Sequence, residues 1–183
     1  MDIGRHSPHP NNRTIELESL YAVLTYRGEL ASWNWAFFVA SPTSHPTGTS
    51  GTIFRVADID GEWKFVTEVK DVVSSPMVVA LVKLGDVSFL GSYEDVVGAD
   101  ALPFMFRLVK IPSQAELALA NNRAYNSRTW FLDAISMLHD HAVVTCDDVW
   151  LLESEIIRYA FAAMDPYLGN KGWSVYRSER CST

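Results

Sequence analysis

The chain has 183 residues, of which 48% are hydrophobic and 20% are charged, and its net charge is -7 at pH 7. This length and composition suit one folded domain and exclude a chain that is disordered throughout. The acidic balance repels phosphate backbones, so nucleic acid is not an expected partner. The uninterrupted apolar runs are six residues at most, far short of the ~20 that cross a bilayer, so no membrane span is expected.

The N-terminus and the cysteines limit the organisation further. Residues 1–14 are polar, with two prolines and two histidines, and lack the basic start and apolar stretch of a secretory signal. We expect a flexible tail over residues 1–14, a single domain over residues 15–183 and a cytoplasmic location. Cys146 and Cys181 are too few for a disulfide scaffold or a four-thiolate zinc site, and both are expected to be free thiols.

The first half of the chain predicts β-structure. Short stretches rich in β-branched and aromatic residues are typical of strands, and they lie at residues 20–26, 33–39, 52–57, 62–68, 77–83 and 104–109. Asp60-Gly61 predicts a tight hairpin turn. Residues 41–50 predict a loop, and residues 92–100 an irregular segment or a short helix.

The second half predicts helices. Ser113, with Glu116 three residues later, forms a capping-box pattern that begins a short helix. A second helix begins near Asn126 or Ser127, and a third spans about residues 148–164, ended by Asp165-Pro166. The fold class is therefore α+β, an antiparallel sheet packed against helices.

Two of these segments combine polar and apolar side chains. Strand alternation puts Asn34 on one face with Ala36 and Phe38, and Trp35 on the other. Ser127 lies at a helix N-terminus, where unpaired backbone amides stabilise negative charge. Because the sheet is expected to pack on that helix, the Asn34 face and Ser127 are expected to meet.

These segments resemble a known superfamily. A strand of form His-Trp-Ala followed by apolar residues, a Gly-Thr hairpin strand and a helix opening as Asn-Cys-x-Thr-Trp mark the circularly permuted NlpC-type, papain-like superfamily, which includes lecithin retinol acyltransferase-like enzymes. Here the first and last motifs are Asn34-Trp35-Ala36 and Asn126 to Trp130. Small fungal proteins of an uncharacterised family are similar in the same features. The resemblance covers residues 20–165 and implies a permuted papain-like architecture.

The resemblance places the family's nucleophilic Cys at Ser127, its His at Asn34 and its third polar residue at Arg55. A serine without an adjacent base is not activated as a thiolate beside an imidazole is, so the thiol-acyl mechanism is expected to be lost. Each residue also has an ordinary structural interpretation. Ser127 can be a helix cap, Asn34 a buried amide bonded to backbone, and Arg55 a half-exposed strand arginine that could otherwise hold a carboxylate.

The expected function is a cofactor-free reaction of an apolar small molecule in an enclosed pocket between sheet and helix. Asn34, Ser127 and Arg55 are the candidate catalytic residues, and the expected substrate-binding residues are Trp35, Ala36, Phe38, Trp130 and Phe131. The fungal resemblance implies specialised metabolism, with cyclisation or isomerisation, for instance a pericyclic step, as the reaction. No metal is expected, since His139 and His141 diverge on a helix.

Two alternatives stay open. One is a Ser127-dependent acyl hydrolase or transferase, with His139 or His141 as its base. The other is a non-catalytic binding scaffold derived from a cysteine-peptidase-like fold. The substrate and the oligomeric state are not determined by the sequence.

Overall fold

The computed structural model describes residues 13–29, 31–44, 48–120 and 125–182, so most of the expected tail, residues 1–12, lies outside it. The fold is α+β and is built on a six-stranded sheet in the order β4-β3-β2-β1-β5-β7. Neighbouring strands are antiparallel except β5 and β7, which are parallel. The strands of this sheet are β1 Ser19–Tyr26, β2 Trp33–Ala40, β3 Ser50–Ile59, β4 Glu62–Asp71, β5 Val78–Asp86 and β7 Ser174–Arg177.

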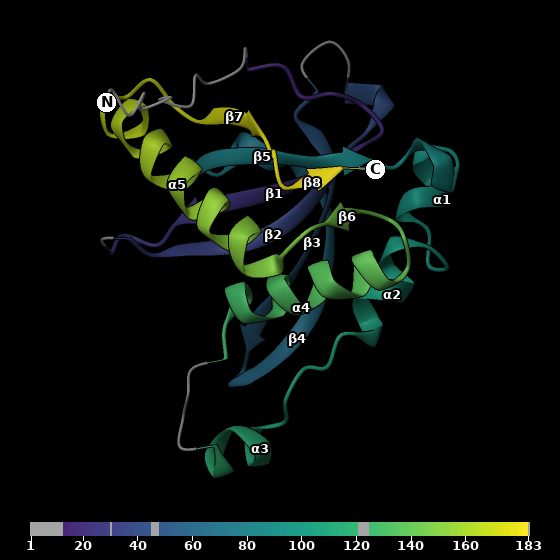
Figure 1. Cartoon of the computed structure of the whole chain (residues 1–183). Coiled ribbons are helices and arrows are strands. Elements are labelled where there is room, and N and C mark those ends of the chain that lie inside the picture. The colour runs from purple at the N-terminus through teal and green to yellow at the C-terminus, as the bar shows by residue number, and fades with distance from the viewer. Residues whose placement is uncertain (1–12, 30, 45–47, 121–124, 183) are drawn as a thin grey trace, which may run out of the picture.

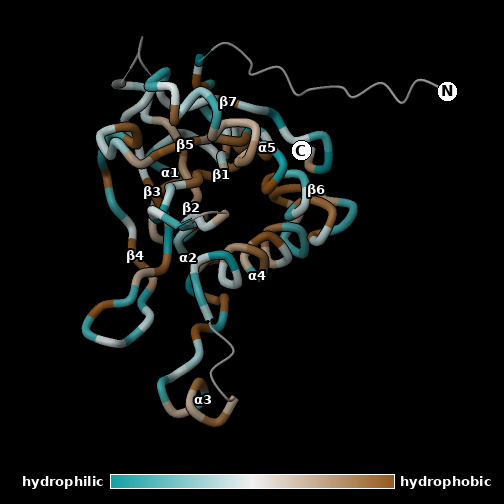
Figure 2. Tube along the Cα trace, turned by 90° about the vertical axis from the view of Figure 1, so that its left-hand side faces the viewer, coloured by the Kyte–Doolittle hydropathy of each residue, from teal (hydrophilic) through white to brown (hydrophobic). Residues whose placement is uncertain are grey.

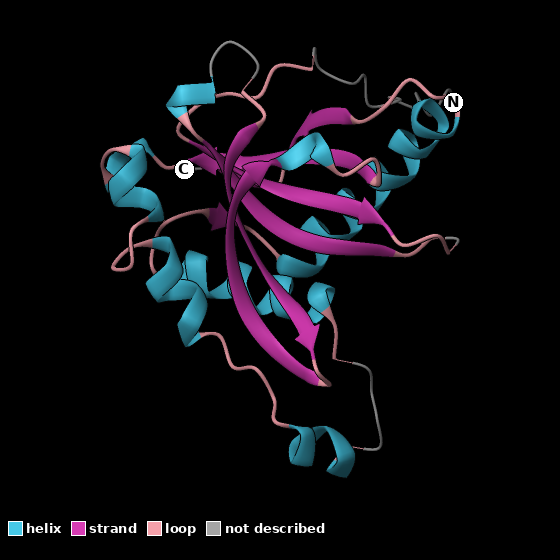
Figure 3. Ribbon diagram, turned by 180° about the vertical axis from the view of Figure 1, so that it is seen from behind, coloured by secondary structure: helices cyan, strands magenta, loops and turns pink. Residues whose placement is uncertain are grey.

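The two long helices, α4 and α5, cover one face of this sheet (Figure 1), and seen from behind the strands lie in front of them (Figure 3). The α-helices are α1 Tyr93–Val97, α2 Leu102–Leu108, α3 Gln114–Leu119, α4 Ser127–Asp140 and α5 Val149–Leu168. Short 3-10 turns are η1 Pro42–Ser44, η2 Val72–Ser74 and η3 Ser88–Leu90, and a small second sheet pairs β6 Thr145–Cys146 with β8 Cys181–Ser182. Helix α3 stands apart from these layers (Figure 2).

The first four strands lie where the sequence predicts them, and turn chemistry sets the register of the hairpin. Asp60 and Gly61 both have positive φ, 55° and 83°, as a two-residue hairpin turn requires. Near the other end of β3, Gly51 packs so close to β2 that an added Cβ would lie 2.1 Å from the Val39 carbonyl oxygen. Only glycine fits this approach without a backbone shift.

Two predictions from the sequence need correction, and one strand of the main sheet was missed. Residues 104–109, expected as a strand, belong largely to helix α2, whose proline lies in the first turn and whose buried side includes Met105 and Phe106. A proline in the first turn costs no backbone hydrogen bond. Helix α5 continues through Pro166 to Leu168, so the proline lies in its last turn and does not end it. Strand β7 was not predicted.

Aromatic side chains fill the space between the sheet and the helices. The ring of Phe37 stacks on Phe131 and Phe106 at centroid distances of 4.3 and 4.8 Å, and Trp130 packs edge-on against it at 5.7 Å. All four side chains are fully buried. Around Phe37, the space between the sheet and α4 is therefore packed core.

The opposite face of the sheet has a smaller apolar cluster of its own. Ala36 and Phe38 pack there with Ile15, Val72 and other side chains. The predicted alternation along β2 is correct, but the expectation that the Asn34, Ala36 and Phe38 face meets the helix is wrong. Trp35 and Phe37 point toward α4 instead. Both faces of β2 carry apolar side chains that become buried, so the alternation did not show which face packs against the helices.

Candidate functional site

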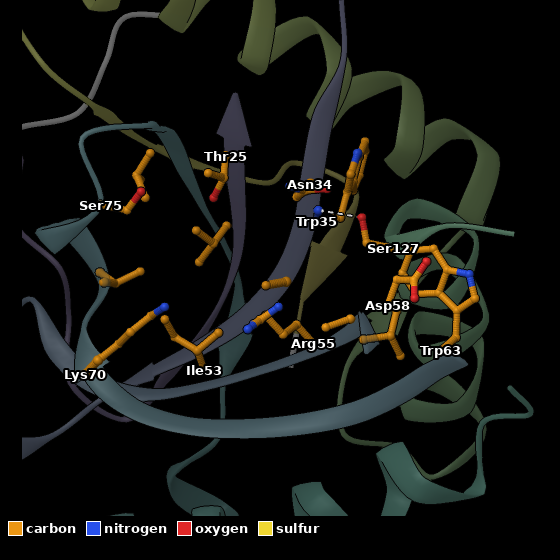
Figure 4. Close-up of a pocket in the computed structure, with 16 residues that line it drawn as sticks. Thr25, Asn34, Trp35, Ile53, Arg55, Asp58, Trp63, Lys70, Ser75 and Ser127 are labelled. Atoms are coloured by element: carbon orange, nitrogen blue, oxygen red, sulfur yellow. Dashed lines mark hydrogen bonds between the residues drawn. The ribbon is translucent and has the colours of Figure 1, made fainter. Parts of the chain in front are cut away.

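A pocket of about 400 Å³ lies where β2 and β3 diverge. The two strands pair only from Phe37 to Ala40 of β2, which leaves residues 33–36 of β2 and 55–59 of β3 unpaired with each other. The lining alternates between both faces of the strands, so the pocket extends from the open face of the sheet into this gap (Figure 4). It is lined by Val23, Thr25, Asn34, Trp35, Ala36, Ile53, Arg55, Val56, Ala57, Asp58, Trp63, Lys70, Val72, Ser75, Val78 and Ser127.

Ser127 reaches the pocket from the first turn of α4. Its Oγ accepts a hydrogen bond of 3.1 Å from the backbone N–H of Trp35. Amides along a strand point alternately to its two neighbours, and here the hydroxyl takes the place of the strand partner that β3 no longer provides. The interpretation of Ser127 as the helix cap is wrong, because Asn126 is the cap and accepts from the Thr129 N–H at 3.1 Å.

Asn34 lies beside this hydrogen bond, on the strand that carries Trp35. It is exposed, whereas Ser127 is 6% exposed. The interpretation of Asn34 as a buried structural amide is therefore wrong. Both residues line the same pocket, the amide at its open side and the hydroxyl in the gap between the strands.

Arg55 enters the pocket from β3 and is held by an ion pair. Its Nη2 lies 2.7 Å from Oε1 of Glu68 on β4, and Nζ of Lys70 lies 2.9 Å from Oε2 of the same carboxylate. These hydrogen bonds, that of Arg55 above all, lower the pKa of the Glu68 carboxyl. The glutamate is therefore ionised near neutral pH and orients both cations.

The predicted substrate-binding residues separate into two groups. Trp35 and Ala36 line the pocket. Phe38, Trp130 and Phe131 do not line it and are fully buried in the two apolar clusters. These three side chains complete the packing of the sheet faces, and their role in substrate binding stays a prediction.

The histidines expected as an alternative base lie at the other end of α4. They are His139 and His141, the histidines within the part of the chain that the structure describes. His139 lies twelve helical positions after Ser127, which corresponds to about 18 Å along the helix axis. The Nδ1 atom of His139 accepts a hydrogen bond from the Cys146 N–H at 3.3 Å, so this ring has a structural contact of its own. Neither ring can take the Ser127 proton in this fold.

Several lining residues were missed from the sequence, Lys70 above all. A signal for Lys70 was present in the hairpin turn. With Asp60-Gly61 at the turn, β3 and β4 pair so that Arg55 lies opposite Val66. Two-residue alternation then puts Glu68 and Lys70 on the face of Arg55.

Comparison of the chain with protein-family models, with curated proteins and with solved structures finds no match. Within the described ranges, no helix is both long and apolar enough to span a membrane. In the same part of the chain, no three His, Cys, Asp or Glu side chains come together as a metal site.

Proposed function

We propose that this pocket binds an apolar small molecule and holds it in the conformation from which it cyclises or isomerises, without a cofactor. The observation that carries the proposal is that Asn34, Arg55 and Ser127, far apart in the sequence, line one pocket with the apolar side chains of Val23, Ile53 and Val78. A volume of about 400 Å³ lies within the range of roughly 300–1,000 Å³ common for small-molecule sites.

The polar groups suit polarisation of a substrate carbonyl. The Ser127 hydroxyl accepts from Trp35, and its own proton is not used by that bond, so it can donate into the pocket. The Asn34 amide supplies further donors. Donors fixed before the reaction stabilise charge as it develops, and the apolar walls select the reactive conformation.

Acyl transfer through Ser127 is not favoured. A serine nucleophile needs a base within hydrogen-bond reach, and the described histidines lie at the far end of α4. The proposed reaction therefore forms no covalent intermediate with the chain.

The permuted papain-like architecture is part of the same proposal. It is supported by the way in which the helix that begins with Ser127 meets the strand that carries Asn34, the two positions that correspond to the superfamily's Cys and His. The resemblance to small fungal proteins supports a role in specialised metabolism.

Binding can be tested with farnesol, a linear and uncharged terpenoid. Trp35 and Trp63 line the pocket, so occupancy is expected to change the tryptophan fluorescence in a saturable way. Thr25→Phe narrows the pocket and is expected to weaken binding, whereas Ala115→Phe, on the exposed face of α3, is not. Melting temperatures of both variants control for folding.

Turnover is tested by incubating linear polyenes and terpenoids with the protein and separating the products by liquid chromatography and mass spectrometry. The expected product has the mass of its substrate and a new retention time, and Asn34→Ala lowers its yield. Absence of saturable binding, or binding unaffected by Thr25→Phe, would overturn the proposal.

A further inference from the structure

We propose that Arg55 and Lys70 form a subsite for a carboxylate, so that the pocket's ligand is an amphipathic monoanion bound by its acid group at the β3–β4 side. This inference rests on the proposed function, because it concerns the same pocket, and it names the class of ligand. Figure 4 shows both cationic side chains at the pocket, directed toward each other, with Asp58 and Trp63 on its other side.

The two cations share one counterion. Arg55 bonds to Oε1 of Glu68 and Lys70 to Oε2, at 2.7 and 2.9 Å, so both cationic heads lie within reach of a single carboxylate. The exposed fractions of the Arg55 and Lys70 side chains are 34% and 42%. Both side chains are therefore partly accessible, and both line the pocket.

The charge of this group is unbalanced. Two cations and one carboxylate leave a local charge of +1 on a chain whose net charge is -7. Asp58, the acidic residue in the lining, lies at the opposite side of the pocket. The cationic side therefore attracts one negative charge and the Asp58 side repels it, which gives the ligand a direction.

The shape of the donors favours a carboxylate as the anion. Arginine has five N–H donors in a planar fork that matches the two oxygens of a carboxylate, and the bond to Glu68 uses Nη2 alone. Apolar side chains, among them Ile53 and Ala36, line the same pocket as Arg55 and Ser127. A ligand with its acid group at Arg55 would then extend its apolar chain toward Ser127 and Asn34.

Three probes that differ only at one end test the inference: farnesoic acid, farnesol and farnesylamine. Each is titrated against tryptophan fluorescence with the unmodified chain and with Arg55→Gln, Lys70→Gln and Lys64→Gln. Lys64 is the matched control, because it lies on β4, is exposed and is paired with a glutamate, Glu62, at 3.3 Å, but does not line the pocket.

The acid is expected to bind about tenfold more tightly than the alcohol, because charge-assisted hydrogen bonds to arginine are stronger than neutral ones. The amine is expected to bind more weakly than both. Arg55→Gln is expected to weaken the acid about tenfold more than the alcohol, so that the advantage of the acid is lost. Lys70→Gln reduces the advantage by about threefold, since its ion pair is exposed, and Lys64→Gln has no effect.

Failure of this inference is distinguishable from failure of the proposed function. If acid and alcohol bind equally, or if Arg55→Gln weakens both probes alike, the carboxylate subsite is overturned. The proposal that the pocket binds an apolar small molecule is then unaffected. If the amine binds most tightly, the subsite has the opposite charge preference and the inference is also overturned. If none of the three probes binds, the proposed function itself is refuted.

Discussion

The Ser127 hydroxyl links the fold to the pocket. Its oxygen accepts from the Trp35 amide in the gap between β2 and β3, and the side chain is buried. A buried amide without a partner is costly, so this serine stabilises the end of β2 whether or not a ligand is bound. The sequence alone pointed to Ser127 through its place at a helix start, but it did not reveal this partner.

We predict that Ser127→Ala lowers the free energy of unfolding by about 1–2 kcal/mol, because the Trp35 amide loses its acceptor. Ser136→Ala is the matched control. Ser136 lies on the same helix, is exposed and bonds only to the Leu132 carbonyl among its described contacts, at 3.3 Å, so its loss is expected to cost under about 0.5 kcal/mol.

Urea unfolding measures both variants, and hydrogen exchange follows the Trp35 amide directly. Faster exchange of this amide in Ser127→Ala, with unchanged exchange in Ser136→Ala, is the expected result. An amide that stays protected in Ser127→Ala would contradict the structural role assigned to the hydroxyl.

The segment before β1 is held on the sheet by Glu16. Its carboxylate accepts from Lys83 on β5 and, at 2.8 Å, from Arg177 on β7, and its backbone N–H donates to the Tyr21 hydroxyl at 2.8 Å. Burial raises the pKa of Tyr21 to about 12, so this hydroxyl remains neutral. Glu16 thus connects β1, β5 and β7 to the segment before β1, which packs on the sheet face opposite the helices.

The Glu16 pair predicts a loss of stability in acid. The hydrogen bond from Lys83, the largest cause, lowers the pKa of the Glu16 carboxyl below its ordinary 4.5. A carboxyl whose pKa is lowered by folding stabilises the protein fully above the unfolded pKa, and this contribution is lost as the pH falls through the folded pKa.

The free energy of unfolding of the unmodified chain and of Glu16→Gln is therefore expected to differ most at neutral pH and to converge below pH 4.5. Denaturant titrations at several pH values measure the difference. Glu29→Gln, an exposed glutamate after β1, serves as the control. A difference between Glu16→Gln and the unmodified chain that grows in acid would contradict the assignment.

Most elements were predictable because their signals are local. Stretches rich in β-branched and aromatic residues predict β1 to β4, the positive φ of Asp60 and Gly61 matches an Asp-Gly turn, and Ser113 caps α3 as the motif indicates. Residues 104–109 were misassigned because their aromatic composition favours a strand, whereas packing of Phe106 against Phe37 favours a helix. Tertiary contacts override propensity in such short segments.

A disulfide between Cys146 and Cys181 closes the C-terminal end of the molecule. It joins β6 to β8, and both cysteines are buried. The Ser178 hydroxyl donates to Glu155 Oε2 at 2.5 Å and accepts from the Cys181 N–H at 3.1 Å, which holds the same segment. The expectation of two free thiols is wrong. Two cysteines cannot form a scaffold of several disulfides, but they can form one disulfide with each other.

We predict that the native chain takes up no iodoacetamide until it is denatured and reduced, as intact mass measures. Cys181→Ser is expected to lower the free energy of unfolding by about 3–4 kcal/mol, the loop-closure value for a separation of 35 residues. Ser182→Ala, on the same strand, is the control.

Labelling of either cysteine in the native chain without reductant would contradict the pairing. Disulfides are rare in the cytosol, so the same measurement on protein from its native source also tests the cytoplasmic location, which stays a prediction.

The sequence by itself determined the α+β class, the first strands and their hairpin, and the helix that begins at Ser127, because periodicity, turn residues and caps act within a few residues. Only the tertiary structure decided which face of β2 meets the helices, where β2 and β3 diverge, and that Lys70 joins Arg55 at the pocket. It also decided that Phe38, Trp130 and Phe131 fill the core. These outcomes depend on contacts between segments that are distant in the chain. Local sequence patterns do not determine the packing energies of such contacts.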